Sequence, residues 1–419
     1  MRKIVHLFIV ILSTGLFLSV KAQTREVIYD ESKVPEYTLP DALICNDSKE
    51  VKTVADWKTI RRPETLRLFE ANVYGKTPDK KVNVRFEVTK KIPDFLNGLA
   101  TLQEVNVVLP DYTLIPVIHF MVITPNGVDA PVPVFAGLNF NGNHTIHPSP
   151  EISLAKVWDP ETGKTALAEE NTRGQNKTRW PVEQLIERGY ALITCYYEDI
   201  DPDYDDGFKN GIHPAFDEIR NESAWGSIGA WAWGLSRMID YAATNPAIDA
   251  SKVAVIGHSR LGKAALWAGA QDERFALVIS NNSGCGGAAL SRREYGETMK
   301  RITTVFPHWF CEKLSTYGDK INALPVDQHQ LIALIASRPV YIASAEEDQW
   351  ADPRGEFLSA FNAVPVYQLL NAGGFPANSM PETNSPVFGQ IGYHIRTGGH
   401  DVTPYDWEQY LNFADLHLK

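Results

Sequence analysis

A single serine stands where a strand-like run of residues meets a helix-like run. The stretch VAVIGHSRLGKAALWAGA, residues 253–270, has β-branched apolar residues before Ser259 and Ala- and Leu-rich text after it. A strained strand-to-helix turn of this kind raises a serine hydroxyl above a parallel sheet, where it can act as a nucleophile in acyl transfer. Gly257 and Gly262 are the small flanking residues, although the second glycine comes one place later than in the usual G-x-S-x-G pattern. The alternative is an ordinary tight turn that needs Gly257 for its backbone.

A serine nucleophile needs a histidine that accepts its proton and a carboxylate that holds this histidine in the correct tautomer. In the predicted arrangement the chain order is serine, acid, histidine, with the histidine in the loop after the last strand. His400 lies in a glycine-flanked loop, TGGHD, just after a strand-like run, so we expect its ring to reach the serine. Among the other histidines that follow the serine, His394 alternates within the strand and should pack, and His417 lies at the frayed end of the chain.

The acid is expected in the loop after the strand-like run RPVYIASA. This loop offers Glu346, Glu347, Asp348 and Asp352. A cluster of this kind is in many proteins only a solvated run of charges. The residues alone leave the choice among the four open.

The elements that must position these residues are strands that alternate with helices from about residue 100 onward. Strand-like runs include PVPVFAGLNF, YALITCYY and IGYHIR, and helix patterns occur at residues 181–189 and 225–243. Such units build a mostly parallel sheet with helices on both faces. We therefore predict an α/β-hydrolase fold, a three-layer sandwich, as a single catalytic domain over residues 23–419. Residues 23 to about 100 form a lead-in, and the stretch before about residue 335 has the character of an insertion.

The first residues predict a secretory signal peptide, residues 1–22. Two cations precede an apolar run from Ile4 to Val20, and residues 20–22 (VKA) have the small-x-small pattern of a cleavage site. An uncleaved membrane anchor is the alternative, but polar and glycine residues at positions 13–15 interrupt the run. We expect an exported protein, periplasmic or secreted, with no membrane contact after cleavage.

The charge balance limits the possible partners. The chain carries a formal net charge of −11 and its cations are scattered. Phosphate binding needs concentrated Lys and Arg, so nucleic acid is not expected as a partner, and an uncharged or weakly charged substrate fits better. The acidic stretch DIDPDYDDGFKNG, residues 199–211, lacks the offsets of a calcium loop and is predicted to be structural.

The four cysteines give no metal-binding pattern. They stand at unrelated spacings without a C-x-x-C pair, so no zinc site is expected. Export permits one disulfide. Any pairing of Cys45, Cys285 and Cys311 stays open, whereas Cys195 lies in a strand-like run and should be a buried thiol.

Five short motifs are distributed over the chain. They are G-H-S-R-L-G-K at 257–263, S-N-N-S-G-C-G-G at 280–287, R-R-E-Y-G-E-T at 292–298, S-A-E-E-D-Q-W-A-D-P at 344–353 and G-G-H at 398–400. Together they resemble carbohydrate esterase family 15, the glucuronoyl esterases, in its bacterial branch. The resemblance covers most of the mature chain, and the late second glycine matches this family.

The resemblance implies roles for individual residues. Many family members carry the acid just after the strand that follows the serine turn, where this chain has Asn282, and an amide cannot carry the charge that stabilises an imidazolium. Some bacterial relatives use an aspartate one strand later, and Asp348 is similar to it, with Glu346 and Glu347 as alternatives. The implied catalytic residues are Ser259 as nucleophile, His400 as general base, Asp348 as acid and Arg260 as oxyanion stabiliser, and the implied sugar contacts are Lys263, Glu297 and Trp350.

These residue types suit ester hydrolysis. The backbone N–H of Arg260 would donate to the oxyanion, and each such donor is worth about 3–4 kcal/mol. A further donor is expected near Asn141 to Asn143. Lys263 lies four residues after Ser259 on the same helix face, at the rim of the pocket. The ordinary alternatives are a structural salt bridge for the arginine, a solvent lysine, a surface glutamate and a packed tryptophan.

The function that follows from the resemblance is that of an exported serine esterase of the 4-O-methyl-glucuronoyl methylesterase type. It would cleave the ester between xylan glucuronic acid and lignin alcohols, as a monomer without metal or organic cofactor. The partner is a carbohydrate substrate, glucuronoxylan or a lignin–carbohydrate ester. The alternatives are a carbohydrate acetyl esterase or broad carboxylesterase on the same triad, and an inactive sugar-binding homologue, which Asn282 suggests.

Overall fold

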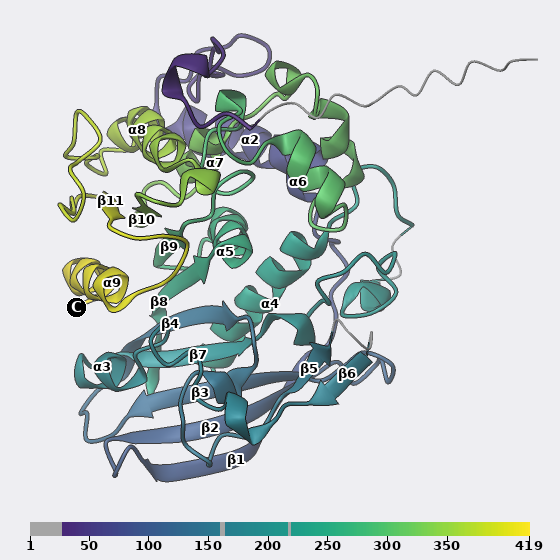
Figure 1. The fold of residues 1–419 in the computed structure, drawn as a ribbon, viewed down its shortest axis with the longest axis vertical. Helices are drawn as coiled ribbons and strands as arrows, with labels where there is room; N and C mark the ends of the chain where they lie inside the picture. Colours follow the sequence, from purple (N-terminus) through teal and green to yellow (C-terminus); the bar gives the residue numbers. More distant parts are fainter. Residues whose placement is uncertain (1–26, 160–163, 217–218) are drawn as a thin grey trace, which may run out of the picture.

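A computed structural model describes residues 27–159, 164–216 and 219–419 of the chain (Figure 1). Within these residues a nine-stranded sheet runs in the order β1-β2-β3-β7-β4-β8-β9-β10-β11, and a separate hairpin pairs β5 with β6. The predicted signal peptide, residues 1–22, lies outside the described residues. No helix in the described ranges is long and apolar enough to cross a membrane.

The strands and helices have the following bounds. The strands of the described residues are β1 (Arg85–Phe95), β2 (Ala100–Val108), β3 (Ile118–Pro125), β4 (Val132–Asn139), β5 (Lys156–Asp159), β6 (Lys164–Leu167), β7 (Ala191–Tyr196), β8 (Ile248–His258), β9 (Leu277–Asn281), β10 (Val340–Ala345) and β11 (Ile391–Arg396). The α-helices are α1 (Val54–Asp56), α2 (Arg62–Phe69), α3 (Val182–Glu187), α4 (Ser227–Ala242), α5 (Arg260–Gln271), α6 (Met299–Val305), α7 (Gln328–Ala333), α8 (Pro353–Leu369) and α9 (Pro404–Leu418).

The large sheet has an antiparallel part and a parallel part. β1, β2, β3 and β7 pair antiparallel in that order. β7, β4, β8, β9, β10 and β11 run parallel to one another. Strands β4, β7, β9, β10 and β11 are buried along their whole length, as expected for a parallel sheet covered on both faces. The carboxyl ends of these strands share one edge of the sheet, so the loops that follow them meet there.

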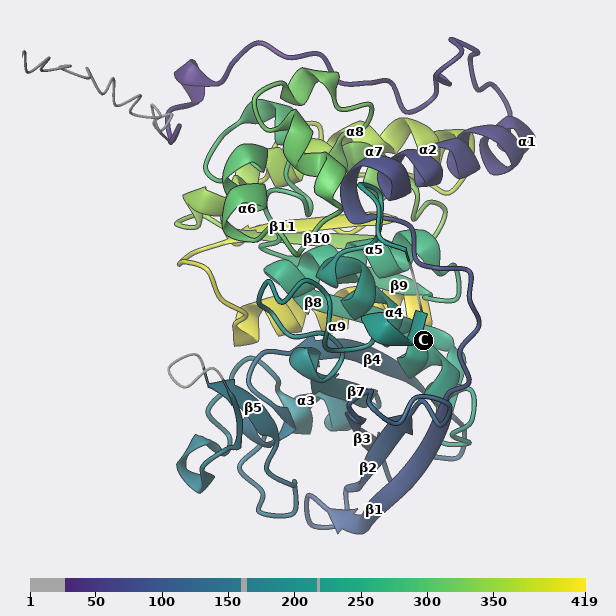
Figure 2. The same ribbon diagram turned by 90° about the vertical axis from the view of Figure 1, so that its right-hand side faces the viewer.

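Helices cover both faces of the sheet, as the two views show (Figure 1, Figure 2). One face packs against α4, α5 and α8, in a core that includes Val255 and Trp267. The other face packs against α3 and α9, in a core that includes Ile256 and Trp407. Adjacent residues of β8 therefore serve opposite cores, as the two-residue period of a strand requires. The predicted three-layer α/β-hydrolase sandwich is confirmed.

The structure defines three segments more closely than the sequence does. Residues 85–95 of the predicted lead-in form β1 and belong to the central sheet. The stretch predicted to be an insertion ends in α7, which packs on α8 because Leu331 and Ile332 join the main core. His417 is not at a frayed end, since it lies in α9 and its Nε2 donates to the Gly389 carbonyl at 3.0 Å.

The turn at Ser259 depends on two glycines, because β8 runs directly into α5. A Cβ on Gly257 would lie 2.0 Å from the carbonyl oxygen of Leu261. A Cβ on Gly262 would lie 2.9 Å from Cβ of Ser283. The late glycine of the motif is therefore explained by packing, since position 262 faces the segment that follows β9.

The first prediction concerns the substitution Gly257→Ala. The added methyl group would clash with a backbone oxygen that cannot move without distorting α5, so we expect the free energy of unfolding to fall by about 2–3 kcal/mol. Urea unfolding followed by tryptophan fluorescence measures this loss. Gly374→Ala is the matched control, because neither glycine has a positive φ and a Cβ at position 374 would approach Val364 no closer than 3.6 Å. Equal losses in the two variants would contradict the packing argument.

Candidate active site

Ser259 occupies the sharp turn in a backbone conformation that non-glycine residues rarely adopt. Its φ is 57° and its ψ is −128°, a strained combination for a residue with a Cβ. Hydrogen bonds hold the strained residue on both sides. Its N–H donates to the Asn281 carbonyl (2.9 Å), and its carbonyl accepts from the N–H groups of Gly262 (2.9 Å) and Lys263 (3.2 Å). This is the geometry of a nucleophile elbow.

The loops after β10 and β11 bring a carboxylate and an imidazole together. Nδ1 of His400 lies 2.6 Å from Oδ2 of Asp348. The carboxylate is buried, whereas 43% of the His400 side chain is exposed. Burial opposes ionisation of Asp348, but the hydrogen bond and charge of His400 outweigh it and lower the pKa of Asp348. An ionised carboxylate on Nδ1 leaves Nε2 as the nitrogen that can accept a proton.

The ring of His400 also lies close to the serine turn. It stacks at a tilt on the ring of His258, the residue before Ser259, with the ring centroids 4.5 Å apart. The loop after β11 and the end of β8 are therefore in direct contact at the carboxyl edge of the sheet.

The other three carboxylates of the β10 loop have different surroundings. Glu346 accepts a hydrogen bond from a threonine hydroxyl at 3.0 Å, and Glu347 is exposed. Asp352 forms an ion pair with Arg293 (2.8 Å) and caps the start of α8. Of the four candidates, Asp348 is therefore the one that contacts the histidine.

Asn282 follows β9 with a φ of 46°. Its Nδ2 donates to Oδ2 of Asp348 at 2.8 Å, so the same oxygen accepts from Asn282 and contacts His400. The amide therefore supports the late carboxylate. A second carboxylate at this position would place two like charges side by side and raise one of their pKa values.

The guanidinium of Arg260 turns toward the acidic loop after β7. It forms an ion pair with Asp203, so the salt-bridge alternative for this arginine has a structural basis. Its Nε is nevertheless buried without a hydrogen-bond partner within the described part of the chain. Its Cζ lies 4.8 Å from the ring centroid of Trp309, 5.7 Å from that of Phe306 and 5.8 Å from that of Phe140. Ring faces attract a cation, so both an anion and aromatic rings hold the side chain.

Asp203 organises this side of the site. Besides Arg260, its buried carboxylate accepts hydrogen bonds from Nε2 of His308 (3.0 Å), Nε1 of Trp309 (2.6 Å) and the Tyr197 hydroxyl (2.8 Å). Burial disfavours its charge, but these donors and the charge of Arg260 outweigh the burial and lower the pKa of Asp203 to about 2. One member of the acidic loop that was predicted to be structural thus contacts the residue after the serine.

Lys263, Glu297 and Trp350 form a second group. Nζ of Lys263 donates to the Ser283 carbonyl, and only 4% of this lysine is exposed. The lysine is therefore buried, whereas its position on the helix predicted a place at the rim of the pocket. Burial lowers the pKa of Lys263 and raises that of Glu297, and each of the two charges opposes the shift of the other. A hydrogen bond from Trp350 also favours the ionised Glu297. The tryptophan itself is 36% exposed, so a lysine and a glutamate lie near a partly open ring.

The loop after β4 is the expected place of a further oxyanion donor. The N–H of Gly142 already donates to Oδ1 of Asn139 at 2.8 Å. The side chain of Asn141 accepts a hydrogen bond from Asn176, and that of Asn143 donates to the His119 carbonyl of β3. A donor from this loop stays a prediction. The N–H of Arg260 begins α5, and the first N–H of a helix has no acceptor within the helix.

The described residues contain neither a metal-ligand cluster nor a disulfide. No group of three His, Cys, Asp or Glu side chains in the described ranges is arranged to hold a metal ion. All four cysteines are buried and free, so the disulfide that export would permit is not formed. Burial raises the pKa of Cys285 and raises that of Cys311 to about 11, which keeps both as thiols.

Several residues around the site were not predicted from the sequence, because they lie outside the five motifs. Asp203 and Trp309 come from the acidic loop and from the stretch predicted to be an insertion. Arg396 and Asp406, below the His400 loop, come from the end of β11 and the start of α9. Asp203 alone had a signal in the sequence. Arg260 directly follows Ser259, and a buried cation needs an anion as partner, which the acidic loop could supply.

The parallel sheet with a strained serine after β8, and a histidine and a carboxylate on the loops after β11 and β10, define an α/β-hydrolase. Comparison with known proteins then identifies the family. Residues 174–371 match the family model for glucuronyl esterase, fungi. Carbohydrate esterase MZ0003 from an unknown prokaryotic organism is 48% identical over 406 residues, which cover 95% of this chain and 94% of that protein.

Solved structures agree with this match. A promiscuous CE15 esterase from a marine bacterial metagenome has 48% identity and a TM-score of 0.88, over 94% of this chain and 100% of the other. A glucuronoyl esterase from Solibacter usitatus has 45% identity and a TM-score of 0.89, over 93% of this chain and 100% of the other. The chain belongs to carbohydrate esterase family 15, the glucuronoyl esterase family, and is a carboxylic ester hydrolase.

The second prediction concerns the anion that holds Arg260. Asp203→Asn keeps the shape of the side chain but cannot neutralise the guanidinium, so we expect Arg260 to shift and kcat/KM to fall about 100-fold. Initial rates on a soluble aryl acetate measure the effect. Asp205→Asn, an exposed aspartate of the same loop, is the control and should retain its activity. Equal rates for the two variants would contradict the prediction that Asp203 holds Arg260 in the position needed for activity.

The third prediction follows from the depressed pKa of Asp203. Its folded-state pKa of about 2 lies below the reference value of 3.8. Ionised Asp203 therefore stabilises the fold above about pH 4, and this stabilisation is lost as the pH falls toward 2. The difference in unfolding free energy between wild type and Asp203→Asn should be largest above pH 4 and shrink below it. Urea unfolding across this range checks the trend, and a difference independent of pH would contradict it.

Proposed function

We propose that this esterase hydrolyses glucuronate esters, in particular those that join the glucuronic acid groups of xylan to lignin alcohols. The observation that carries the proposal is the 2.6 Å contact of His400 with Asp348 beside the strained turn of Ser259. The substrate class is supported by the Solibacter usitatus protein, described as a glucuronoyl esterase. A protein of Phanerochaete carnosa described as a 4-O-methyl-glucuronoyl methylesterase, 27% identical over 85% of this chain, supports the same class.

In the proposed acylation step, Oγ of Ser259 attacks the ester carbonyl carbon while Nε2 of His400 takes the hydroxyl proton. Asp348 holds Nδ1 and stabilises the imidazolium that forms. Negative charge develops on the carbonyl oxygen, where the N–H of Arg260 donates, and such a donor is worth about 3–4 kcal/mol. The C–O bond then breaks, His400 gives the proton to the departing alcohol, and the uronoyl group remains on the serine.

In the deacylation step, water takes the place of the alcohol. His400 accepts a proton from the water as its oxygen attacks the acyl carbon. Collapse of the second tetrahedral intermediate breaks the bond to Ser259, which regains its proton from the imidazolium. The free uronic acid leaves. These steps need no metal or organic cofactor.

Recognition of the sugar is assigned to the second group of residues. Lys263 and Glu297 offer a donor and an acceptor for ring hydroxyls, and the exposed ring of Trp350 offers a flat apolar face. A neutral uronate ester fits this site because the lysine and glutamate charges largely compensate each other. Ester cleavage converts the neutral group into a carboxylate, so the product differs from the substrate by one negative charge.

The proposal places the enzyme outside the cytoplasm. Removal of residues 1–22 as a signal peptide would release it to the periplasm or the medium, where plant cell-wall polymers are encountered. A monomer with a carbohydrate-ester substrate is the proposed working form, without contact with nucleic acid or membrane.

A broader carboxylesterase activity is the second candidate. It is favoured by a relative of 48% identity that is described as a promiscuous esterase of the same family. Such an enzyme, or a carbohydrate acetyl esterase, would use Ser259 without needing Lys263. Asn282 no longer favours the inactive sugar-binding alternative, because its side chain donates to Asp348 at 2.8 Å while that carboxylate contacts His400.

The fourth prediction tests substrate and acid together. Hydrolysis of benzyl and methyl glucuronate esters is compared with acetate release from acetylated xylan, by wild type, Ser259→Ala and Asp348→Asn. We expect preferential cleavage of the uronate esters and a loss of about 10³-fold or more in kcat for Ser259→Ala. Asp348→Asn should lose about 10²- to 10⁴-fold, since an amide favours the wrong histidine tautomer.

Two further variants serve as controls for this experiment. Glu347→Gln changes an exposed carboxylate of the same loop and should keep the wild-type rate. Lys263→Met should reduce uronate-ester turnover more than aryl acetate turnover. Faster cleavage of acetyl esters by wild type would overturn the substrate assignment, and an active Asp348→Asn would overturn the acid assignment.

A further inference from the structure

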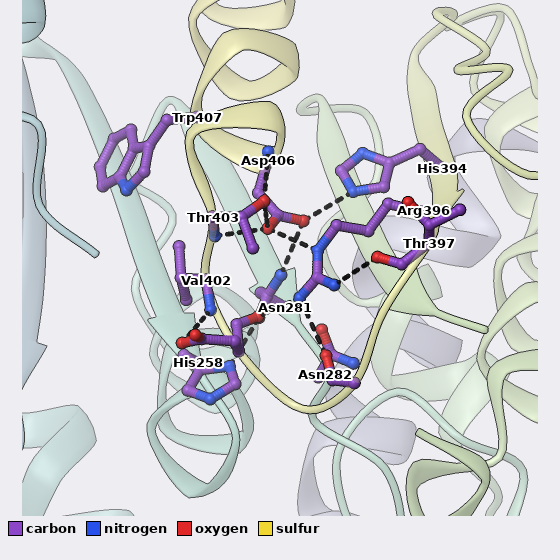
Figure 3. Close-up of polar contacts among 12 residues, drawn as sticks. His258, Asn281, Asn282, His394, Arg396, Thr397, Val402, Thr403, Asp406 and Trp407 are labelled. Carbon is purple, nitrogen blue, oxygen red and sulfur yellow. Dashed lines mark hydrogen bonds and ion pairs between the residues drawn. The ribbon is translucent and has the colours of Figure 1, made fainter. Parts of the chain in front are cut away.

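A buried polar network is enclosed by the loop that joins β11 to α9 (Figure 3). Its centre is Asp406, which lies in the first turn of α9 and is fully buried. Oδ1 of this carboxylate accepts from Nε2 of His394 (2.9 Å) and Nδ2 of Asn281 (3.3 Å). Oδ2 accepts from Nε of Arg396 (2.7 Å) and from N–H (2.6 Å) and Oγ1 (2.7 Å) of Thr403. Two of these donors lead to the proposed catalytic residues.

The first connection passes through Arg396. Its Nη1 donates to the carbonyl of Thr397 (2.9 Å), and its Nη2 donates to the carbonyls of Gly399 (3.1 Å) and Asp401 (2.6 Å). The last two residues flank His400. The guanidinium, which Figure 3 shows between the carboxylate and the loop, therefore holds the chain on both sides of the histidine.

Val402 anchors the end of this loop in the core on the α9 face, but apolar packing does little to hold the residues just before His400. Gly398 has a φ of 91°, and a Cβ on Gly399 would meet no atom within 4 Å. An ion pair of Arg179 with Asp401 (2.6 Å) reaches the loop from outside, but both side chains are partly solvent-exposed. A glycine-rich, exposed segment has many accessible conformations. The backbone on both sides of His400 is therefore held mainly by hydrogen bonds, and those of Arg396 are buried at their source.

The second connection passes through Asn281. A carboxylate only accepts, so Nδ2 of this amide faces Asp406 and its Oδ1 faces the other way. Oδ1 accepts from Nδ1 of His258 at 2.6 Å, and the backbone carbonyl accepts from the N–H of Ser259 at 2.9 Å. Burial, with the neighbouring His400, lowers the pKa of His258 to about 3, so this ring is neutral. Asn281 thus joins the carboxylate to the serine turn.

The two connections meet again above the network, where the His258 ring stacks on that of His400. We infer that Asp406 is a positioning residue for ester hydrolysis: through Arg396 it fixes the loop of His400, and through Asn281 it fixes the turn of Ser259. One buried carboxylate thereby sets the nucleophile and the base relative to each other. The inference rests on the proposed roles of Ser259 and His400.

The test uses Arg396→Lys in the full-length enzyme. Lysine keeps a charge beside Asp406 but cannot donate in several fixed directions at once. We expect kcat to fall about 100-fold with KM within about threefold of wild type. The rate at which a fluorophosphonate labels Ser259 should fall by a similar factor. Labelling needs the serine and the histidine but no sugar recognition, so it reports the pair directly.

Arg338→Lys is the matched control. The Arg338 guanidinium likewise donates to three backbone carbonyls, those of Gly269 (2.6 Å), Asp272 (3.1 Å) and Phe275 (3.0 Å), but it precedes β10 at the opposite edge of the sheet. This variant should lose thermal stability while its kcat and labelling rate stay within about twofold of wild type. The pair of variants separates a loss of stability from a loss of alignment.

If Arg396→Lys labels Ser259 at the wild-type rate while its Tm falls as in the control, Asp406 is structural only and the inference is overturned. If circular dichroism shows that Arg396→Lys is unfolded, His258→Leu replaces it, since it removes the hydrogen bond between the Asn281 side chain and the serine turn without unpairing buried ions. Labelling slowed about fivefold or more then supports the inference, and unchanged labelling overturns it.

The proposed substrate is judged separately. A wild-type enzyme that is labelled at Ser259 but does not cleave uronate esters would overturn the substrate assignment. The labelling rates of the variants would still decide the role of Asp406.

Discussion

The hydrogen bond between His400 and Asp348 is a consequence of two neighbouring parallel strands. β10 and β11 pair in register up to Ala345 and Arg396, and the ladder continues beyond both strands. The N–H of Glu346 donates to the Arg396 carbonyl (2.9 Å), and that of Glu347 donates to the Gly398 carbonyl (3.1 Å). The two chains therefore leave the sheet side by side, about 4.8 Å apart, and the carboxylate and imidazole follow within a few residues. No long loop is needed to bring the two side chains together. The serine that follows β8 lies at the same carboxyl edge of the sheet.

A single ionised carboxylate is enough to pair with the imidazole. Among Asp348, Asn282 and Glu356, Asp348 alone is a group of this kind next to the imidazole. The position after β9 carries an amide, Asn282, which donates to Asp348 where a second carboxylate would repel it. Glu356 lies nearby, but burial above all raises its pKa to about 8, and the charge of Asp348 adds to this shift. At neutral pH Glu356 is therefore mostly protonated. The late acid and the early amide act as a complementary pair, so Asn282 is an argument for activity.

Local patterns in the sequence predict the residues that need an unusual backbone or a fixed chain order. The glycines around Ser259, the glycine-flanked loop of His400 and the alternation of strands with helices are of this kind, and the family resemblance directed the choice of Asp348. Asp203 could not be predicted in the same way, because its role comes from a partner 57 residues away. The same holds for Asp406, whose carboxylate reaches Asn281 across 125 residues. Such contacts are defined by the order of strands in the sheet, which local text does not specify.

Buried charge explains why segments without motifs belong to the site. Arg260 and Lys263 begin α5 next to the nucleophile, and a buried cation is tolerated only when an anion and further hydrogen bonds compensate its desolvation. The acidic loop supplies Asp203 to the first cation, and the segment before α6 supplies Glu297 near the second. Trp309 contacts both cations through its ring face. The requirement for compensation therefore brings two distant segments to one helix N-terminus. Segments without a motif in the sequence are in this way needed to compensate the buried cations beside Ser259.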